Sequence, residues 1–441
     1  MSRAHWCSRI GFILAAAGSA VGLGDVWKFP YVTASNGGGV FLLTYVVICL
    51  TLGVVLMTME MALGRAANAD AVGIFKKLKG GAWPLAGYGA VLSCFLILSF
   101  YCSVGGWTVA YIGKTLTGSI LTSDAEALRR DFDNFKAGWF QPVFFLCIFS
   151  GLTLSVVLAG VQKGIEALSK YMMPILLFLM LILIVRGLTL PGAMAGVSYY
   201  LKPDFSKLTP RMVVDAMGLA FFSLSLGMGI MLTYGSYVER GINLLHSSLW
   251  VISLTLGTSF LAGLMVLPAV FAFGFNLQEG PGLTFVTMPA VFAQMPGGSV
   301  WAVAFFVLLL VAALTSSVSL LEVIASFLID EFKWSRRRAA VTATLGFAAL
   351  GVFVSWSLGP LSHWTLFGKN LFTLLDFITS NLLMPLVEMA IALFAGWIVW
   401  PRVEEELTNQ NAKPVWLAPM RIFVRFLAPA AIALVLINGL R

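Results

Sequence analysis

The chain has 441 residues, of which 59% are hydrophobic and only 11% are charged. Soluble domains carry about 25% charged residues, and the mean hydropathy here is +0.92. These values exclude a disordered protein, a secreted disulfide scaffold and an ordinary cytosolic enzyme, and they predict an all-α polytopic membrane protein. The net charge of +8 does not indicate nucleic-acid binding, because the basic residues lie between apolar runs, where membrane topology explains them.

Cysteines and histidines are few, and their spacing fits neither a metal site nor a disulfide framework. We therefore expect no organic cofactor and no His-based metal centre. The first apolar run, which follows Arg9, is too long and too rich in glycine for a signal peptide.

Eleven apolar runs are long enough to cross a bilayer, which takes about 20 residues. They cover 9–35, 39–64, 86–116, 140–159, 164–187, 211–237, 247–274, 299–329, 339–357, 369–400 and 421–440. The semi-apolar segment 276–297 contains three prolines and is predicted as a re-entrant or capping loop. Residues 1–441 therefore form one membrane domain. Most Lys and Arg residues fall in loops that are cytoplasmic if the N-terminus is inside, so we predict an N-terminus inside and a C-terminus outside.

Two spans, the first and the sixth, are poor helices in their middles. Glycine-rich segments interrupt them at 18–25 and 222–229, and each glycine costs about 1 kcal/mol in a helix interior. Such interruptions in corresponding spans point to a 5+5 inverted repeat with discontinuous helices 1 and 6. The repeats would be 9–187 and 211–400, with 421–440 as an extra helix 11. The alternative is that these glycines only allow close packing between helices.

Asp25 and Lys28 are the charges deep in the first span. An aspartate near the bilayer centre costs about 2.5–3.5 kcal/mol, so it needs a partner, a cation or a proton unless it reaches the interface. The eighth span carries consecutive hydroxyls at Thr315, Ser316 and Ser317. They could supply oxygens to a hard cation or bond back to their own helix.

These segments resemble the neurotransmitter:sodium symporter family in its prokaryotic amino-acid branch, from Trp6 through the tenth span. The matching blocks are Arg9–Phe12, Ala20–Gly24, Trp27–Tyr31, Asn36–Gly39, Phe222–Gly227 and Leu314–Ser317. The resemblance implies a leucine-transporter-type fold.

The resemblance also implies two sodium sites. One would use the carbonyls of Gly18, Val21 and Ala312 and the hydroxyls of Thr315 and Ser316. The other would use the Ala20 carbonyl, Asp25, Ser223, Thr255 and the substrate carboxylate.

Position 25 departs from the family, which usually has asparagine there. The family's chloride set would map to Tyr45, Ser223, Thr255 and Ser259, but its usual glutamine is replaced by Leu219. Our hypothesis is that Asp25 supplies the fixed negative charge, so that chloride is not required. The alternative is that a protonated Asp25 takes part in proton-linked transport.

The substrate site implied by the resemblance lies between the same breaks. Gly22 stands where amine-selective relatives carry an aspartate, which leaves room for the carboxylate of an α-amino acid. The full predicted set is Ala20, Gly22, Ile97, Tyr101, Phe222, Ser223, Ser225, Met228, Ser316 and Leu320. Its side-chain end is apolar and uncharged, which favours a neutral hydrophobic or aromatic side chain.

The family's gates also map onto this chain. The inner gate would use Arg3, Trp6, Ser236, Tyr237 and Asp330. The outer gate would use Lys28, where the family has arginine, with Asp376 as candidate partner. In the fifth span, Gly164 and Pro174 resemble a motif at which the helix unwinds, although a kink that serves packing is an alternative.

Together these residues predict a sodium-coupled symporter of neutral hydrophobic or aromatic L-amino acids that works by alternating access. We expect it in the inner membrane of a prokaryote, with no obligate protein partner. A proton-linked transporter and a non-transporting amino-acid sensor are the alternatives. An enzyme is disfavoured because no histidine accompanies the buried hydroxyls, and saturable uptake would distinguish a transporter from a channel.

Overall fold

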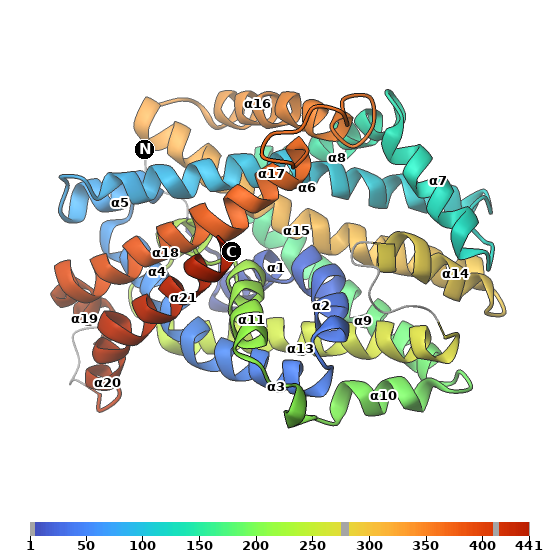
Figure 1. Ribbon diagram of the computed structural model, residues 1–441. Helices are drawn as coiled ribbons and strands as arrows, with labels where there is room; N and C mark the ends of the chain where they lie inside the picture. Colours follow the sequence, from blue (N-terminus) through green and yellow to red (C-terminus); the bar gives the residue numbers. More distant parts are fainter. Residues whose placement is uncertain (1–4, 275–281, 409–413, 441) are drawn as a thin grey trace.

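The computed structural model describes residues 5–274, 282–408 and 414–440. Regular structure in these ranges is helical, apart from one isolated bridge between Leu366 and Lys369. The predicted all-α class is therefore confirmed. The long helices run roughly side by side (Figure 1).

The α-helices are α1 (Arg9–Ala20), α2 (Phe29–Ser35), α3 (Gly39–Ile48), α4 (Val54–Ala67), α5 (Ala71–Leu78), α6 (Pro84–Leu116), α7 (Ala125–Ala137), α8 (Gln141–Leu158), α9 (Ala167–Leu188), α10 (Ala193–Leu201), α11 (Pro210–Ser223), α12 (Ile230–Gly235), α13 (Leu244–Ala272), α14 (Met288–Ala293), α15 (Gly298–Phe332), α16 (Arg336–Trp356), α17 (Leu371–Phe377), α18 (Met384–Leu393), α19 (Trp400–Thr408), α20 (Leu417–Ile422) and α21 (Ala428–Gly439). Short π-helical turns join several of them: η1 (Gly24–Lys28), η2 (Cys49–Gly53), η3 (Val161–Glu166), η5 (Leu283–Thr287), η6 (Ile378–Leu383), η7 (Phe394–Ile398) and η8 (Phe423–Leu427). One 3₁₀ turn, η4, covers Phe205–Lys207.

Nine continuous helices within the described ranges are long and apolar enough to cross a membrane. A tenth candidate is the bent pair Arg9–Ala20 and Gly24–Ser35, whose halves meet at 48°. The predicted sixth span consists of α11 and α12, and neither is long enough to count by itself. Of the predicted loop 276–297, residues 276–281 lie outside the described residues. The remainder forms η5 and α14, which are buried and too short to span.

Polar side chains begin many of these helices, as expected for N-caps. Ser8 Oγ accepts the Gly11 N–H at the start of α1, and Asn243 Oδ1 accepts the His246 N–H at the start of α13. Asp70 accepts the N–H groups of Val72 and Gly73 at the start of α5. These caps set where the helices begin.

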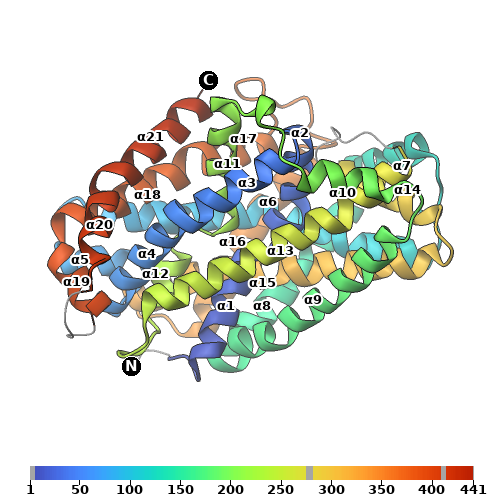
Figure 2. The same cartoon turned by 90° about the horizontal axis from the view of Figure 1, so that it is seen from below.

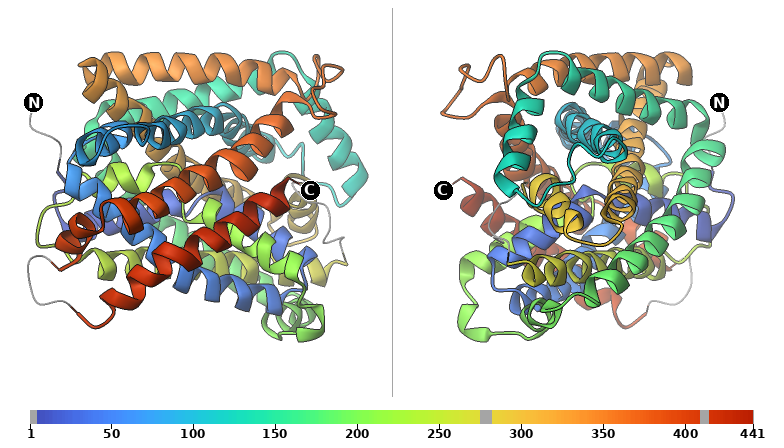
Figure 3. Two further views of the ribbon diagram at one scale, coloured as in Figure 1. Left: turned by 60° about the vertical axis from the view of Figure 1, so that its left-hand side comes forward. Right: turned by 90° about the vertical axis from the view of Figure 1, so that its right-hand side faces the viewer.

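The centre of the bundle is α15, which packs against α1, α6, α8, α9 and α16. Figure 2 shows α1 crossing the bundle interior, between α13 and α15. Figure 3 shows α16 along one edge, with the loop that follows it projecting from the bundle. Both breaks in the helices therefore lie inside the protein, away from lipid, where irregular backbone is tolerated.

Candidate functional site

The first break begins where α1 ends. Val21 has an extended backbone (φ −75°, ψ 93°), and helical structure resumes at Gly24 in η1. The N–H of Gly22 donates to Asp25 Oδ2 at 3.3 Å, and the N–H of Leu23 donates to the Tyr101 hydroxyl at 3.3 Å. In an unbroken helix these N–H groups would donate to backbone carbonyls, but at the break they donate to side-chain oxygens.

The second break separates α11 from α12. Ser225, Gly227 and Gly229 all have positive φ, at 56°, 73° and 74°. A Cβ on Gly227 would lie 2.3 Å from the Met384 carbonyl oxygen, so only glycine fits there. Both predicted interruptions are therefore present, five predicted spans apart.

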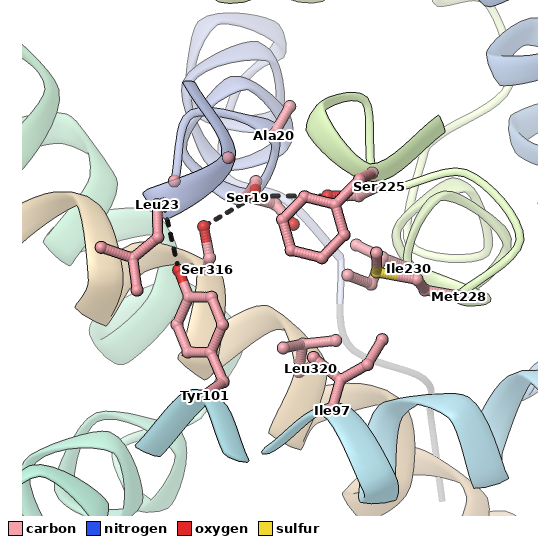
Figure 4. Close-up of a pocket in the computed structure, with 13 residues that line it drawn as sticks. Ser19, Ala20, Leu23, Ile97, Tyr101, Ser225, Met228, Ile230, Ser316 and Leu320 are labelled. Atoms are coloured by element: carbon pink, nitrogen blue, oxygen red, sulfur yellow. Dashed lines mark hydrogen bonds between the residues drawn. The ribbon is translucent and has the colours of Figure 1, made fainter. Parts of the chain in front are cut away.

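A small cavity lies between the two breaks (Figure 4). Nine of the ten predicted substrate residues line it: Ala20, Gly22, Ile97, Tyr101, Phe222, Ser225, Met228, Ser316 and Leu320. Ser19, Leu23, Gly24 and Ile230, which were not predicted, complete the lining. Ser223, the tenth predicted residue, lies outside it.

The lining contains no charged group, and its volume is about 20 Å³, about the room needed by one water molecule. A Cβ on Gly22 would lie 2.3 Å from Ser316 Oγ and 3.1 Å from the Tyr101 hydroxyl. Position 22 therefore has no space for a side chain in this arrangement.

The carbonyl oxygen of Ser19 links α1 to two other walls of the cavity, which are α15 and the second break. It accepts hydrogen bonds from Ser316 Oγ of α15 at 2.9 Å and from Ser225 Oγ of the second break at 3.3 Å. Figure 4 shows both bonds converging on this one oxygen.

The predicted sodium residues of the eighth span lie on α15 beside the end of α1. Ser316 reaches α1 directly through the Ser19 carbonyl, and Gly18 and Val21 flank that region in the chain. Thr315 Oγ1 instead bonds to the Ala312 carbonyl of its own helix at 3.0 Å. Among the described residues, no cluster of three His, Cys, Asp or Glu side chains could hold a metal ion, so an ion here would rely mainly on neutral oxygens.

Asp25 is fully buried at the centre of the other predicted ion site. Its Oδ1 accepts the Ser259 hydroxyl at 2.5 Å, and within the described ranges it forms no ion pair with Lys or Arg. Ser223 Oγ and the Tyr45 hydroxyl are buried without a hydrogen-bond partner, while Thr255 Oγ1 bonds to the Val251 carbonyl at 2.9 Å. A buried carboxylate is costly unless it is paired or binds a cation. Asp25 and the hydroxyls near it are therefore suited to a bound cation.

At the inner end, Trp6 is held by the second broken span. Its Nε1 donates to the Tyr234 carbonyl at 3.2 Å, and its ring packs against Tyr234 and Tyr237. Asp330 Oδ2 accepts the Asp70 N–H at 3.0 Å, and Ser236 Oγ donates to the Thr233 carbonyl. Arg3, the predicted partner of Asp330, lies outside the described residues.

A second ionic contact at this end was not predicted from sequence. Glu322 is fully buried on α15, pairs with Arg336 at 2.6 Å, and accepts the Tyr237 hydroxyl at 2.9 Å. Arg336 also donates to the Val157 carbonyl at 2.9 Å, which ties α8 to the same contact. The sequence carried a signal for Glu322, because a carboxylate inside an apolar run is by itself a candidate functional residue.

Glu60 on α4 was also not predicted from the sequence, although it too is a carboxylate inside an apolar run. Its Oε1 accepts the Gly227 N–H at 2.9 Å, so it holds the second break in place. Glu388 of α18 is its buried neighbour.

At the outer end, Lys28 lies over the Phe222 ring, with Nζ 5.0 Å from the centroid. Asp376, the predicted partner, accepts the Ser380 hydroxyl at 3.0 Å, and no ion pair within 4.0 Å joins the two described residues Lys28 and Asp376. In the fifth span, Gly164 belongs to the π-helical turn η3, and α9 continues through Pro174 without a break.

Apolar spanning helices, two facing breaks and a buried uncharged cavity between them are the features of a helical membrane transporter. The sequence matches the Sodium:neurotransmitter symporter family over residues 3–127 and 122–441. The chain therefore belongs to this family, which confirms the resemblance seen in the motifs, and it is a transporter and not an enzyme.

Named relatives agree with this assignment. The sodium-dependent transporter YhdH of Bacillus subtilis is 41% identical over 98% of this chain and 97% of its own. The sodium-dependent serotonin transporter of Drosophila melanogaster is 30% identical over 81% of this chain and 65% of its own. The crystal structure of MhsT in complex with L-phenylalanine superposes with a TM-score of 0.91, at 41% identity, over 99% of this chain and 100% of that one.

Proposed function

We propose that this protein couples the inward flow of sodium to the uptake of a neutral hydrophobic or aromatic L-amino acid. The observation that carries the proposal is the uncharged cavity between the two breaks, with a hydroxyl and backbone groups at one end and Ile97, Met228 and Leu320 at the other. The similarity to MhsT, solved with L-phenylalanine, supports the same substrate class.

The polar end of the cavity suits the substrate's carboxylate. Tyr101 accepts the Leu23 N–H and keeps its own O–H hydrogen as a donor. Since Gly22 brings no carboxylate, an α-amino acid fits better here than a biogenic amine.

The apolar end must expand to admit a side chain, because the cavity holds only about 20 Å³. Met228 is unbranched and adaptable, and it lies between two glycines with left-handed backbone, so it is the residue best placed to move.

Sodium is transported cargo in this proposal, and Asp25 supplies the fixed charge at one of its two sites. Ala20, Ser223 and Thr255 would add neutral oxygens there, and Gly18, Val21, Ala312, Thr315 and Ser316 would form the other site. Because Ser259 donates to Asp25 and Leu219 offers no amide, we propose that chloride is not required.

Transport would proceed by alternating access. In the occluded state, Lys28 and Phe222 cover the cavity from outside, while Trp6, Tyr237 and the Glu322–Arg336 pair close the inner path. Loosening of α1 and unwinding of the fifth span between Gly164 and Pro174 would then release sodium inward. Ions and substrate are coupled because they stabilise the same closed state.

We also propose that α11 and α12 together form the sixth span, which brings the number of spans to eleven, with the N-terminus inside and the C-terminus outside. The matching breaks in the first and sixth spans support two inverted repeats, 9–187 and 211–400, with 421–440 outside them. The setting would be a prokaryotic inner membrane.

The first experiment measures the thermal midpoint of the purified protein with a panel of amino acids, in sodium gluconate and in potassium gluconate. A ligand that binds the folded state raises the midpoint. Stabilisation by hydrophobic or aromatic amino acids in sodium alone supports the proposal. Equal stabilisation in both cations contradicts sodium coupling.

Uptake into proteoliposomes separates transport from sensing. Accumulation driven by a sodium gradient is expected. Binding without accumulation would show a sensor, and accumulation driven by a proton gradient alone would favour a proton-linked transporter.

A further inference from the structure

A groove of about 710 Å³, which shares no lining residue with the transport cavity, lies between the end of α16 and the start of α17. Leu350 and Phe353 of α16 form one wall, and Leu371 and Leu374 of α17 form the other. The loop between these helices closes the groove with Leu361, Trp364 and Leu366. Its walls are therefore mostly apolar, and the polar lining residues are Ser357, His363, Thr365 and Lys369.

The loop ends in a tight hairpin. Leu366 and Lys369 exchange two backbone hydrogen bonds, at 2.9 and 3.0 Å, and the two residues between them, Phe367 and Gly368, have φ of 54° and 72°. Positive φ at both central positions is typical of a two-residue hairpin, but a phenylalanine is costly there. Phe367 is also 86% exposed and Trp364 is 73% exposed. A strained turn that presents large apolar side chains calls for a functional explanation.

Neighbouring aromatic residues place this hairpin at the depth of a membrane surface. Trp139, just before α8, packs on Trp356 at the end of α16, with ring centroids 5.1 Å apart. Trp356 Nε1 donates to the Trp139 carbonyl at 3.0 Å, and Phe140 is 73% exposed. Tryptophan is enriched where hydrocarbon meets headgroups. Figure 3 shows the loop projecting from the bundle at the end of α16.

The polar lining of the groove favours an anion. Lys369 and His363 line it and no acidic residue does. Among the described residues Lys369 forms no ion pair, and its Nζ lies 5.1 Å from the Phe377 ring centroid. An apolar groove with a cation at headgroup depth is complementary to an anionic phospholipid.

We propose that this groove is a binding site for an anionic phospholipid, whose acyl chain lies between α16 and α17 and whose phosphate meets Lys369. Trp364 and Phe367 insert among neighbouring lipids and hold the hairpin in place. No residue that lines the groove also lines the transport cavity, so this inference stands or falls separately from the proposed substrate.

The test uses the full-length protein in phosphatidylcholine nanodiscs that contain a trace of phosphatidylglycerol with a photoreactive diazirine in its acyl chain. After illumination, labelled peptides are mapped by mass spectrometry. We expect labelling concentrated in residues 350–374 and suppressed by unlabelled phosphatidylglycerol. Labelling spread over the lipid-facing surface in proportion to exposure overturns the proposal, and so does equal labelling by a phosphatidylcholine probe with the same chain.

Two variants sharpen the result. Lys369→Gln should lower labelling of 350–374 by about fivefold, which corresponds to about 1 kcal/mol for one lysine near an anionic headgroup. Leu366→Asp, at a side chain that is 58% exposed, should reduce it further by placing a carboxylate in the groove. Lys202→Gln and Leu208→Asp change exposed residues of another loop and should leave labelling unchanged. Each variant is compared as monodisperse protein with normal helicity, and unchanged labelling of Lys369→Gln would refute the role of the lysine.

Discussion

Replacing Asp25 by asparagine tests the proposed source of charge at the sodium site. The substitution preserves the size of the side chain and keeps an oxygen that can accept the Ser259 hydroxyl. In the native protein this hydroxyl lies 2.5 Å from Asp25 Oδ1. It removes the only formal charge that the protein is proposed to offer sodium there. The experiment therefore isolates charge from shape.

The expected magnitude follows from burial. Asp25 is 0% exposed, and removing one partner of a buried charge pair costs about 3–5 kcal/mol. At 1.4 kcal/mol per factor of ten, sodium affinity in chloride-free buffer should fall by at least about 100-fold. Chloride should restore part of this loss, because the buried hydroxyls of Tyr45 and Ser223 have no hydrogen-bond partner and can donate to an anion.

The assay is sodium-dependent amino-acid binding and uptake, each measured in gluconate and in chloride. Asp215→Asn is a matched control, since Asp215 lies on α11 and lines a cavity that contains none of the proposed sodium ligands. Chloride-free sodium affinity that is unchanged in Asp25→Asn would refute the reasoning. Loss of proton-driven uptake in the same variant, with sodium binding intact, would favour the proton-linked alternative.

Three further predictions concern other parts of the molecule. Gly22→Ala should abolish the thermal shift with amino acids while sparing the fold, because the added Cβ would lie 2.3 Å from Ser316 Oγ and overpacking costs about 1–3 kcal/mol. A normal shift would show that the amino acid binds elsewhere. Glu322→Gln should open the inner path, because it removes the charge that pairs with Arg336 and leaves only an amide oxygen to accept the Tyr237 hydroxyl. Hydrogen exchange of residues 6–20 should therefore rise; unchanged exchange would show that the charge pair does not hold this end closed. Burial and the nearby charge of Asp330 raise the pKa of Asp70 from 3.8 to about 6. Between these pH values the folded protein binds more protons than the unfolded chain, so its stability falls as pH rises from about 4 to 6. Asp70→Asn, which keeps the helix cap, should raise the thermal midpoint at pH 7.5 by more than at pH 4.5, whereas an equal effect at both pH values would contradict the assigned ionisation.

Local sequence was enough to predict both breaks, whereas most of the cavity residues were predicted through the resemblance to a known family. Glycine is the residue that tolerates positive φ, so Gly227 and Gly229 mark the second break directly. Ile97 and Tyr101 are four residues apart on one helix, so they share a face. The positive φ of Ser225 could not be predicted, because a serine there carries no such local signal.

Contacts between distant segments could not be read in this way. The partner of Glu322 is Arg336, which lies beyond the end of α15, and the acceptor for Gly227 is Glu60, four predicted spans earlier. Each of these residues is an unusual charge in an apolar run, but only packing decides what it meets. The same holds for Lys28, whose neighbour is the Phe222 ring and not a carboxylate in direct contact.

The carbonyl oxygen of Ser19 has a consequence for the kinetics of opening. It accepts one hydroxyl from α15 and one from the second break, so both of its lone pairs are in use. If α1 moves away, the two bonds break together, because they end on the same atom. A movement of α1 away from both neighbours therefore costs two hydrogen bonds in the same step, so this one oxygen couples the release of α15 to the release of the second break.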